Sequence, residues 1–172
     1  LAEENNDPTR KNRDVVHPLI NGMDITRRPR SMYIIDFGVD TLEEEAQRYS
    51  VPYAYLEQHV KEQRASLREE NRRDRWWLHQ RPRPILRQKL TSLTRFIATP
   101  RVAKHRLFVW LNSEVIPDSR IYAICREDDY FFGVLHSKLH EVWSLATSSW
   151  HGVGNDPTYN NTTCFETFPF PW

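Results

Sequence analysis

The stretch RLFVWLNSEVIPDSRIYAICREDDYFFGVL, from Arg106 to Leu135, decides the fold class of this sequence. It holds three short runs of aromatic and β-branched residues, separated by the connectors NSEVIPDS and REDD, which carry turn-forming residues. Runs of this length and composition, bounded by turn signals, are typical of β-strands. We therefore predict a small, mostly antiparallel sheet with strands at 106–111, 120–125 and 130–135.

Helical spacing follows this stretch. In SKLHEVWSLA, apolar residues recur every three or four positions, at Leu139, Val142, Trp143 and Ala146. Such spacing is typical of a helix with one apolar face. We expect this helix to cover one face of the sheet.

Helices are also predicted before the sheet. Thr41 and Glu44 have the spacing of a capping box, Pro52 suits the first turn of a second helix, and ILRQKLTSL resumes helical spacing. SMYIIDF, residues 31–37, has the composition of a buried strand. These elements indicate an α+β fold, in which an N-terminal helical and basic segment packs with the small sheet and its covering helix.

The length of 172 residues, 39% of them hydrophobic, suits a single domain with one core of ordinary size. We expect residues 1–15 to form a flexible N-terminal segment and residues 16–172 to form the domain. Because the sequence begins with Leu1, we interpret it as a fragment of a larger protein. The sequence has no apolar run long enough to span a membrane, and it has no secretory leader. We therefore predict a cytoplasmic location without membrane contact. Cys125 and Cys164 are predicted to be reduced core thiols.

Positive charge is concentrated in one part of the chain. Between Lys61 and Arg106 there are fourteen Lys and Arg residues against four Asp and Glu, although the net charge of the chain is only +1. Arginine-rich blocks of this kind suit phosphate and base-edge contacts. The alternative is a solvated helix face, or a protein-interaction domain whose basic helices dock an acidic partner.

Four catalytic or metal-binding interpretations have little support in the sequence. NDPTY, residues 155–159, is similar to the Asn/Asp-Pro-Pro-Tyr/Phe loop of DNA amino-methyltransferases, but it has Thr in place of the second Pro, and the glycine-rich turn that such enzymes need is missing. Pro117-Asp118 lacks the downstream Asp/Glu-x-Lys of a metal-dependent nuclease. His136 and His140 have zinc-compatible spacing without further ligands nearby, and the acids of CREDDY indicate a solvated hairpin tip. We therefore predict no catalytic residue and no metal site.

Two segments are candidates for binding instead. TPRVAKHRLFVW places Arg101, Lys104, His105 and Arg106 where their donors can converge on phosphates. SSWHGVGNDPTYNN supplies polar and aromatic side chains that can reach base edges, although Asn and Asp are also ordinary turn formers. The adjacent Trp76 and Trp77 suit a core anchor better than a stacking surface.

Several blocks of the sequence together resemble the target-recognition domain of MmeI-like type IIG/IIL restriction-modification enzymes. The resemblance covers about Val16 to Trp172 and is carried by NGMDITRRPR…YIIDFG, RRDRWWLH…RP…L, RFIATPRVAKHRLFVWL…PDSRIYAI…DDYFFGVLHSKLHEVWSL and GNDPTYNNTTCFETFPFPW. It implies a module that recognises a sequence in double-stranded DNA, with catalysis in a methyltransferase domain of the same polypeptide. It also implies a parent protein that is a site-specific adenine-N6 DNA methyltransferase, with or without endonuclease activity.

The resemblance also assigns candidate residues and cofactors. It implies S-adenosylmethionine as the cofactor of the parent protein, leaves Mg²⁺ open there, and implies no cofactor for this fragment. The segment before FETFPFPW corresponds to reading positions in the family, and the basic segment corresponds less closely to phosphate or base contacts. The predicted base readers are Trp150, His151, Asn155, Asp156, Tyr159 and Asn160, and the predicted phosphate or base contacts are Arg101, Lys104 and Arg106.

Overall fold

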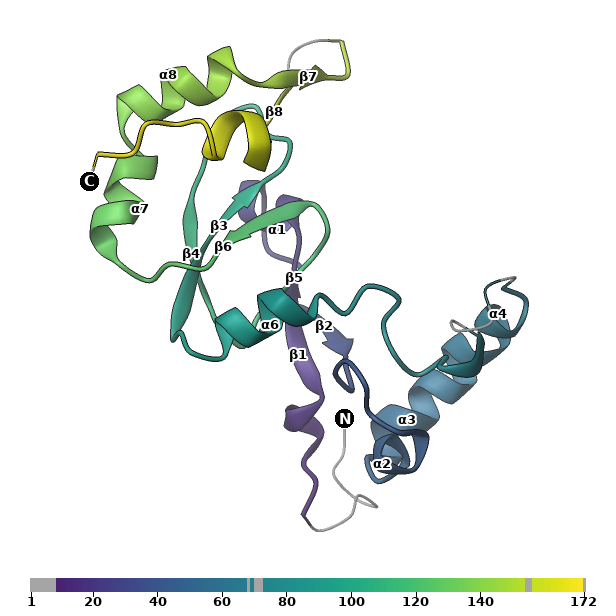
Figure 1. Cartoon of the computed structure of the whole chain (residues 1–172). Helices are drawn as coiled ribbons and strands as arrows, with labels where there is room; N and C mark the ends of the chain where they lie inside the picture. Colours follow the sequence, from purple (N-terminus) through teal and green to yellow (C-terminus); the bar gives the residue numbers. More distant parts are fainter. Residues whose placement is uncertain (1–8, 68, 70–72, 154–155, 172) are drawn as a thin grey trace. The chain divides into compact units, whose positions relative to one another are not determined.

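The computed structural model describes residues 9–67, 69, 73–153 and 156–171 of the chain. It divides into two compact units, which are described separately: unit 1 comprises Leu1–Pro18 and Tyr33–Ile85, and unit 2 comprises Leu19–Met32 and Leu86–Trp172. Runs of helices and runs of short strands follow one another along the chain, and the small sheets are mostly antiparallel (Figure 1). The predicted α+β fold class is thus confirmed.

Unit 1 is mainly helical. Its elements are a 3-10 turn at Asn12–Asp14, strand β1 (Val16–Ile20), whose last two residues belong to unit 2, strand β2 (Met32–Ile35), and helices α2 (Glu43–Gln47), α3 (Ser50–Leu56) and α4 (Glu62–Ala65), the last two joined by a π-helical turn at Glu57–Lys61. The predicted strand at 31–37 corresponds to β2, which is hydrogen-bonded to β1, but its first two residues, Met32 and Tyr33, are exposed and not buried as predicted. Pro52 lies in the first turn of α3, where its missing N–H leaves no hydrogen bond unmade.

The predicted capping box of α2 is wrong. The residue that caps the helix is Leu42, and α2 begins at Glu43. The Thr41 hydroxyl instead donates a hydrogen bond to the carbonyl oxygen of Phe37, one turn back in the chain. Thr41 therefore closes the turn after β2 and leaves the start of α2 without a side-chain cap.

The core of unit 1 is aromatic. Trp76 and Trp77 are both buried, and the ring of Trp76 lies 5.3 Å from the ring of Tyr53. The indole N–H of Trp77 donates to the carbonyl oxygen of Thr41 at 2.9 Å. Since buried aromatic rings contribute large apolar areas, the interpretation of the tryptophan pair as a core anchor fits its place in this core.

Unit 2 contains the sheet that positions the functional site. Its strands are β3 (Arg95–Pro100), β4 (Val109–Asn112), β5 (Ile116–Pro117), β6 (Ile121–Ile124), β7 (Ser149–His151) and β8 (Asp156–Thr158). Its helices are α1 (Gly22–Thr26), α6 (Pro84–Leu90), whose first two residues belong to unit 1, α7 (Asp129–Leu135) and α8 (Lys138–Ala146), followed by a π-helical turn at Asn161–Phe165. Strand β3 is central, with β4 and β6 antiparallel on either side. The end of β1 pairs with β5 in parallel.

Strand β3 was not predicted, because it lies inside the basic block. Residues 96–100 are all buried, and their side chains alternate between two apolar clusters. Ile97 packs with Phe108 and Leu135, whereas Phe96 and Ala98 pack on the opposite side. A strand that is buried on both faces shows no alternation of polar and apolar residues, so it lacks the usual sequence signal.

Two of the three predicted strands are confirmed as β4 and β6, and the third is wrong. Residues 129–135 form helix α7, which begins where the Asp128 carboxylate accepts a hydrogen bond from the backbone N–H of Phe131 at 2.8 Å. Phe131 and Leu135, four residues apart, both point into the core. The N-cap and this spacing outweigh the strand-like composition of YFFGVL.

Helix α8 is confirmed, but its buried face differs from the predicted one. His140 and Ser144 are buried, whereas Leu139 and Val142 are 78% and 55% exposed. The ring of His140 lies 4.7 Å from that of Phe168, in the C-terminal segment. A buried histidine in the core-facing row is therefore an unpredicted feature of this helix.

Two remaining predictions concern the cysteines and the membrane. Cys125 and Cys164 are both free thiols, as predicted, and Cys164 is buried. Within the described ranges, every helix is too short or too polar to cross a lipid bilayer.

Candidate nucleic-acid interface

Unit 2 contains a cleft of about 690 Å³ that collects residues from four separate parts of the sequence. The walls come from α1, the segment that follows β3, the turn before β6, and the hairpin formed by β7 and β8. The lining residues are Gly22, Met23, Thr26, Arg27, Arg101, Val102, Ala103, Lys104, His105, Leu107, Ser119, Arg120, His151, Asp156 and Thr158.

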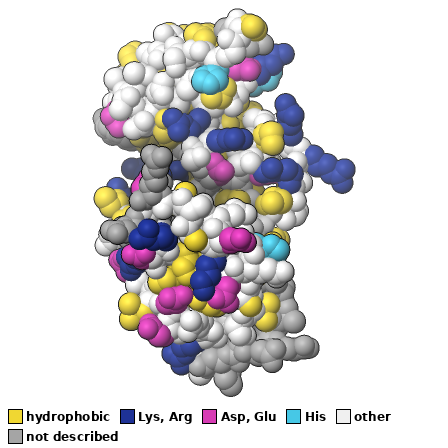
Figure 2. All heavy atoms as spheres, turned by 90° about the vertical axis from the view of Figure 1, so that its right-hand side faces the viewer, with side chains coloured by type: hydrophobic (Ala, Val, Ile, Leu, Met, Phe, Trp, Pro, Cys, Tyr) yellow, Lys and Arg dark blue, Asp and Glu magenta, His cyan; other side chains and the backbone are white. Residues whose placement is uncertain are grey.

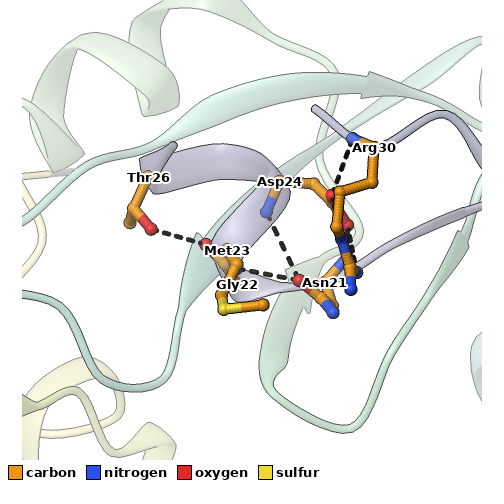
Figure 3. A network of polar contacts seen from close by, with 6 residues as sticks. All are labelled: Asn21, Gly22, Met23, Asp24, Thr26 and Arg30. Carbon is orange, nitrogen blue, oxygen red and sulfur yellow. Dashed lines mark hydrogen bonds and ion pairs between the residues drawn. The ribbon is translucent and has the colours of Figure 1, made fainter. Parts of the chain in front are cut away.

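Helix α1 is short and is fixed by its own polar side chains (Figure 3). The Asn21 side-chain oxygen accepts hydrogen bonds from the backbone N–H groups of Met23 and Asp24, and the Asp24 carboxylate accepts one from the N–H of Asn21 at 2.9 Å. This reciprocal arrangement is a capping box built from Asn and Asp. It defines where the single helical turn begins.

The ion pair between Asp24 and Arg30 closes the same segment. The Arg30 side chain donates from Nε at 2.9 Å and from Nη2 at 3.1 Å to the two carboxylate oxygens, and the backbone N–H of Arg30 donates as well. The hydrogen bonds from Arg30 hold the pKa of the Asp24 carboxyl well below its usual range. The segment from Asn21 to Arg30 is thus tied into a loop that supports Arg27.

Four cations line the cleft: Arg27, Arg101, Lys104 and Arg120. All four residues are exposed, and none of their side chains forms an ion pair with any residue that the structure describes. The backbone N–H of Arg101 donates to the carbonyl oxygen of Arg120 at 2.9 Å, which brings these two residues together. Arg101 also lies over the Tyr122 ring, with 5.1 Å between its guanidinium carbon and the ring centroid.

One carboxylate, that of Asp156, stands among the residues that line the cleft. With four cations against this one carboxylate, the lining of the cleft is strongly cationic. Figure 2 shows Lys and Arg side chains gathered on the upper part of the face that it draws, with histidine and hydrophobic side chains between them. Exposed cations that form no ion pair with a described residue favour the binding of a polyanion at such a concave surface.

The β7–β8 hairpin forms the other wall. Its register pairs Ser149 with Thr158, Trp150 with Pro157, and His151 with Asp156. Residues opposite each other in an antiparallel pair share a face, and neighbours alternate faces. His151, Asp156 and Thr158 accordingly line the cleft, whereas Trp150 lies on the other face and is 53% exposed.

The structure brings together four of the predicted site residues: Arg101, Lys104, His151 and Asp156 all line the cleft. Asn160 is half-buried, and its side-chain amide donates to the Ser149 hydroxyl at 3.4 Å. Asn155 lies outside the described residues.

Two other predicted contacts, Tyr159 and Arg106, do not reach the cleft. Tyr159 is 1% exposed and packs in the core. Arg106 is half-buried, and its guanidinium donates to Thr99 and to the carbonyl oxygens of Pro100 and Pro157. Because their polar groups are turned inward, this conformation gives no support to the direct DNA contact predicted for either side chain.

Arg27 and Arg120 are site residues that the sequence analysis missed. Arg27 comes from NGMDITRRPR and Arg120 begins the run that forms β6. Neither belongs to the basic segment at 101–106, and only the fold places them beside it. The adjacent pair Arg27-Arg28, outside a helix, was the one sequence signal that could have indicated a phosphate contact here.

The acidic and histidine motifs have structural roles. The acids of CREDDY surround the start of α7: Glu127 accepts from Thr94, Asp128 caps the helix, and Asp129 pairs with Arg95 at 2.8 Å. They are thus not a hairpin tip. His140 uses both ring nitrogens inside the protein, and within the part of the chain that the structure describes no three His, Cys, Asp or Glu side chains form a potential metal site.

Several basic residues of unit 1 are engaged internally. Lys61 pairs with Glu57 at 2.7 Å, Arg75 pairs with Asp40 at 3.2 Å, and Arg64 donates to the carbonyl oxygens of Trp76 and Leu78. These contacts give no support to the alternative in which basic helices dock an acidic partner.

Comparisons with known proteins agree with the resemblance noted in the sequence. A family model described as the target recognition domain of MmeI matches residues 3–172. The solved structure of the type IIL restriction-modification enzyme MmeI in complex with DNA matches 94% of this chain with a TM-score of 0.66 and 14% sequence identity. The chain covers 21% of that structure's chain, about a fifth of its length. A search of curated proteins found no match.

Proposed function

The chain belongs to the MmeI target recognition domain family, and from this premise we propose that it recognises a short sequence in double-stranded DNA for a restriction-modification enzyme. The related solved structure is a complex with DNA, and its fold is shared over 94% of this chain. In our proposal the cleft in unit 2 is the surface that meets the duplex.

The observation that carries this proposal is the division of the cleft into two chemically different walls. Arg27, Arg101, Lys104 and Arg120 supply cations that form no ion pair with any residue the structure describes, and these suit the phosphate backbone. The hairpin supplies His151, Asp156 and Thr158, whose short polar side chains suit the edges of bases. A two-stranded ribbon is also narrow enough to enter the major groove.

Among the other predicted readers, Trp150 and Asn160 remain proposals. Trp150 is exposed on the hairpin face turned away from the cleft, where its ring is free to stack against a sugar or a base. Asn160 follows β8, and its side-chain amide donates to Ser149, which leaves its oxygen to accept a hydrogen bond from a base.

We further propose that the parent protein is a site-specific adenine-N6 DNA methyltransferase and that this module has no catalytic role of its own. In this proposal, S-adenosylmethionine and the flipped adenine bind in a methyltransferase domain elsewhere in the same polypeptide, because chemistry on a base requires its extrusion from the stack. Incubation of the same protein with DNA and Mg²⁺ would show whether it also cuts DNA. Single-molecule sequencing of DNA from cells that express the whole protein would reveal a methylated adenine within one short motif, whereas the absence of modified adenines would exclude this activity.

The DNA-binding proposal is tested by titrating the full protein with a duplex at increasing salt concentration. If the four cations neutralise phosphates, the logarithm of the affinity falls linearly with the logarithm of the salt concentration, by about 0.9 per contact. The full protein is needed because other parts of it can contribute to affinity. Absence of duplex binding at about 50 mM salt, where this attraction is strong, would refute the proposal.

A further inference from the structure

Arg106 and Tyr159 connect the wall of the cleft that carries the cations to the wall formed by the hairpin, although neither residue lines the cleft. The Arg106 guanidinium donates to the Thr99 hydroxyl at 3.0 Å and to the carbonyl oxygen of Pro100 at 2.7 Å, both at the end of β3. It also donates to the carbonyl oxygen of Pro157 at 3.3 Å, in β8. One side chain thus links the central strand of the sheet to the hairpin.

The acceptors of Arg106 are all neutral. Within the described ranges it forms no ion pair, and burial lowers the pKa of its guanidinium. Its charge lies over the ring of Tyr159, 4.8 Å from the centroid. A half-buried cation satisfied by carbonyl oxygens and an aromatic face serves to fix geometry, since its donors are engaged within the protein.

Tyr159 is held on every side. Its backbone N–H donates to the carbonyl oxygen of Arg101 at 2.7 Å, and its ring lies between those of Phe108 and Tyr122. The hydroxyl is 3.1 Å from Nε2 of His140, a residue with no exposed surface.

The direction of the hydrogen bond between Tyr159 and His140 follows from its neighbours. Nδ1 of His140 lies 2.9 Å from the carbonyl oxygen of Leu135, which can only accept, so Nδ1 carries the proton. Burial lowers the pKa of His140, which favours the neutral ring, and Nε2 is then an acceptor. The Tyr159 hydroxyl therefore donates to His140, and helix α8 is tied to the end of the hairpin.

Backbone contacts extend this link to the cation wall. The N–H of Ala103 donates to the carbonyl oxygen of Pro157 at 3.5 Å, and Val102 forms an antiparallel bridge with Thr158. The segment that carries Arg101 and Lys104 is thus fastened directly to the strand that carries Asp156 and Thr158.

We propose that Arg106, Tyr159 and His140 form a positioning network that sets the distance between the phosphate-binding wall and the base-reading wall, and that they control sequence discrimination without touching DNA. This inference rests on the proposed function. With the network intact, side chains on the hairpin meet base edges only when the cation wall is seated on the phosphates. When the network is loosened, the protein still binds phosphates, but the hairpin side chains are no longer aligned with the base edges.

The test uses the full protein and a pool of duplex DNA with a randomised core. Wild-type protein selects a preferred sequence from the pool, and the affinity ratio between that sequence and the unselected pool measures discrimination. Tyr159→Phe keeps the ring beneath Arg106 but removes the hydrogen bond to His140. We expect the ratio to fall about tenfold, the scale of one lost base contact, with the salt dependence of pool binding unchanged.

Tyr130→Phe is the matched control. Its hydroxyl also makes one hydrogen bond, at 2.7 Å to the carbonyl oxygen of Pro171, but it lies on the exposed side of α7. Discrimination should be unaltered in this variant. If Tyr159→Phe discriminates as well as wild type does, the positioning role is overturned while the DNA-binding proposal stands. If wild-type protein selects no sequence, the proposed function itself fails.

Arg106 provides the second, independent measurement. Arg106→Gln removes the charge, and Arg106→Lys keeps it with fewer donors. A positioning role predicts reduced discrimination with an unchanged salt slope in the first variant and partial recovery of discrimination in the second. A fall of the slope by about 0.9 in Arg106→Gln would make Arg106 a phosphate contact and overturn the inference. Circular dichroism melting of each variant identifies any that is unfolded, and the remaining variants then decide the question.

Discussion

Asp156 stands directly opposite His151 across the β7–β8 hairpin, and both side chains line the cleft in unit 2. Since Asp156 is the one carboxylate among the lining residues, it would repel a phosphate group. A carboxylate in this position suits a hydrogen-bond donor, and the exocyclic amino groups of cytosine and adenine are the donors that the major groove presents. The pair thus places an acceptor beside a residue that can donate.

Asp156→Asn is expected to change sequence preference more than it changes affinity. The amide keeps the shape of the side chain but adds donors and removes the negative charge, so non-specific binding should rise slightly and discrimination should fall by about 1–3 kcal/mol. Competition between the preferred duplex and single-base variants measures both quantities. An equal loss of affinity for every sequence would instead assign Asp156 to the scaffold.

Arg27 and Arg28 form a matched pair for the phosphate contacts. They are adjacent and exposed, but only Arg27 lines the cleft. We expect Arg27→Ala to lower the slope of log affinity against log salt by about 0.9 and Arg28→Ala to leave it unchanged. Arg120→Ala should behave like Arg27→Ala. Equal effects of the two adjacent substitutions would mean that general charge, and not the cleft, attracts the DNA.

Asp24→Asn should destabilise unit 2 in a pH-dependent way. The Asp24 side chain is only 2% exposed and accepts hydrogen bonds from Asn21 and Arg30, so we expect a loss of about 1–3 kcal/mol at neutral pH. Because the pKa of this carboxyl is depressed in the folded protein, its contribution is complete above the unfolded value of about 3.9 and is lost as the pH falls further. Urea unfolding at several pH values should show the gap between wild type and variant narrowing below about pH 4.

Asp129→Asn is the control for this substitution. Its carboxylate pairs with Arg95 at 2.8 Å but is 80% exposed. Exposed ion pairs contribute about 0–1 kcal/mol, so the control should unfold nearly as wild type does. A gap between Asp24→Asn and wild type that stays constant from neutral to acidic pH would contradict the assignment of the ionised Asp24.

His140 should remain neutral below the pH at which a free histidine ionises. Burial lowers its pKa from the usual value of about 6.5. Just below that pH, His140 therefore binds a proton more readily in the unfolded chain than in the folded chain. The free energy of unfolding should therefore decline as the pH falls below about 6.5, through the window between the unfolded and folded values. Nitrogen NMR of labelled imidazole at neutral pH should show the neutral ring with its proton on Nδ1, and a proton on Nε2 would refute the hydrogen-bond direction assigned here.

Local signals in the sequence predicted part of the fold. Runs around Val109–Asn112 and Ile121–Ile124 are bounded by turn residues, and they became strands as expected. At residues 130–135 the composition predicted a strand where the structure has a helix, because Asp128 supplies an N-cap and the core residues Phe131 and Leu135 lie four positions apart. Composition failed also at β3, whose burial on both sides removes the alternation that identifies a strand.

The candidate site was predicted only where its residues lie close together in the sequence. Arg101, Lys104, His151 and Asp156 came from two segments, and the fold brings both to one cleft. Burial is what the sequence could not reveal: Tyr159 has the chemistry of a base reader, yet its hydroxyl faces His140. Which side of a strand faces the core depends on register, and one residue of shift reverses it.

Unit 2 is discontinuous in sequence, since Tyr33–Ile85 of unit 1 is inserted between Met32 and Leu86. During synthesis, the ribosome releases Arg27 well before it begins the strands beside which Arg27 will lie, and the intervening chain must emerge first. A gene fragment that starts at Leu86 would encode the sheet and the hairpin but would omit the α1 wall. Truncations and fusions that aim to isolate the cleft must therefore retain the N-terminal half of the chain, through Ile85, or replace Tyr33–Ile85 with a linker.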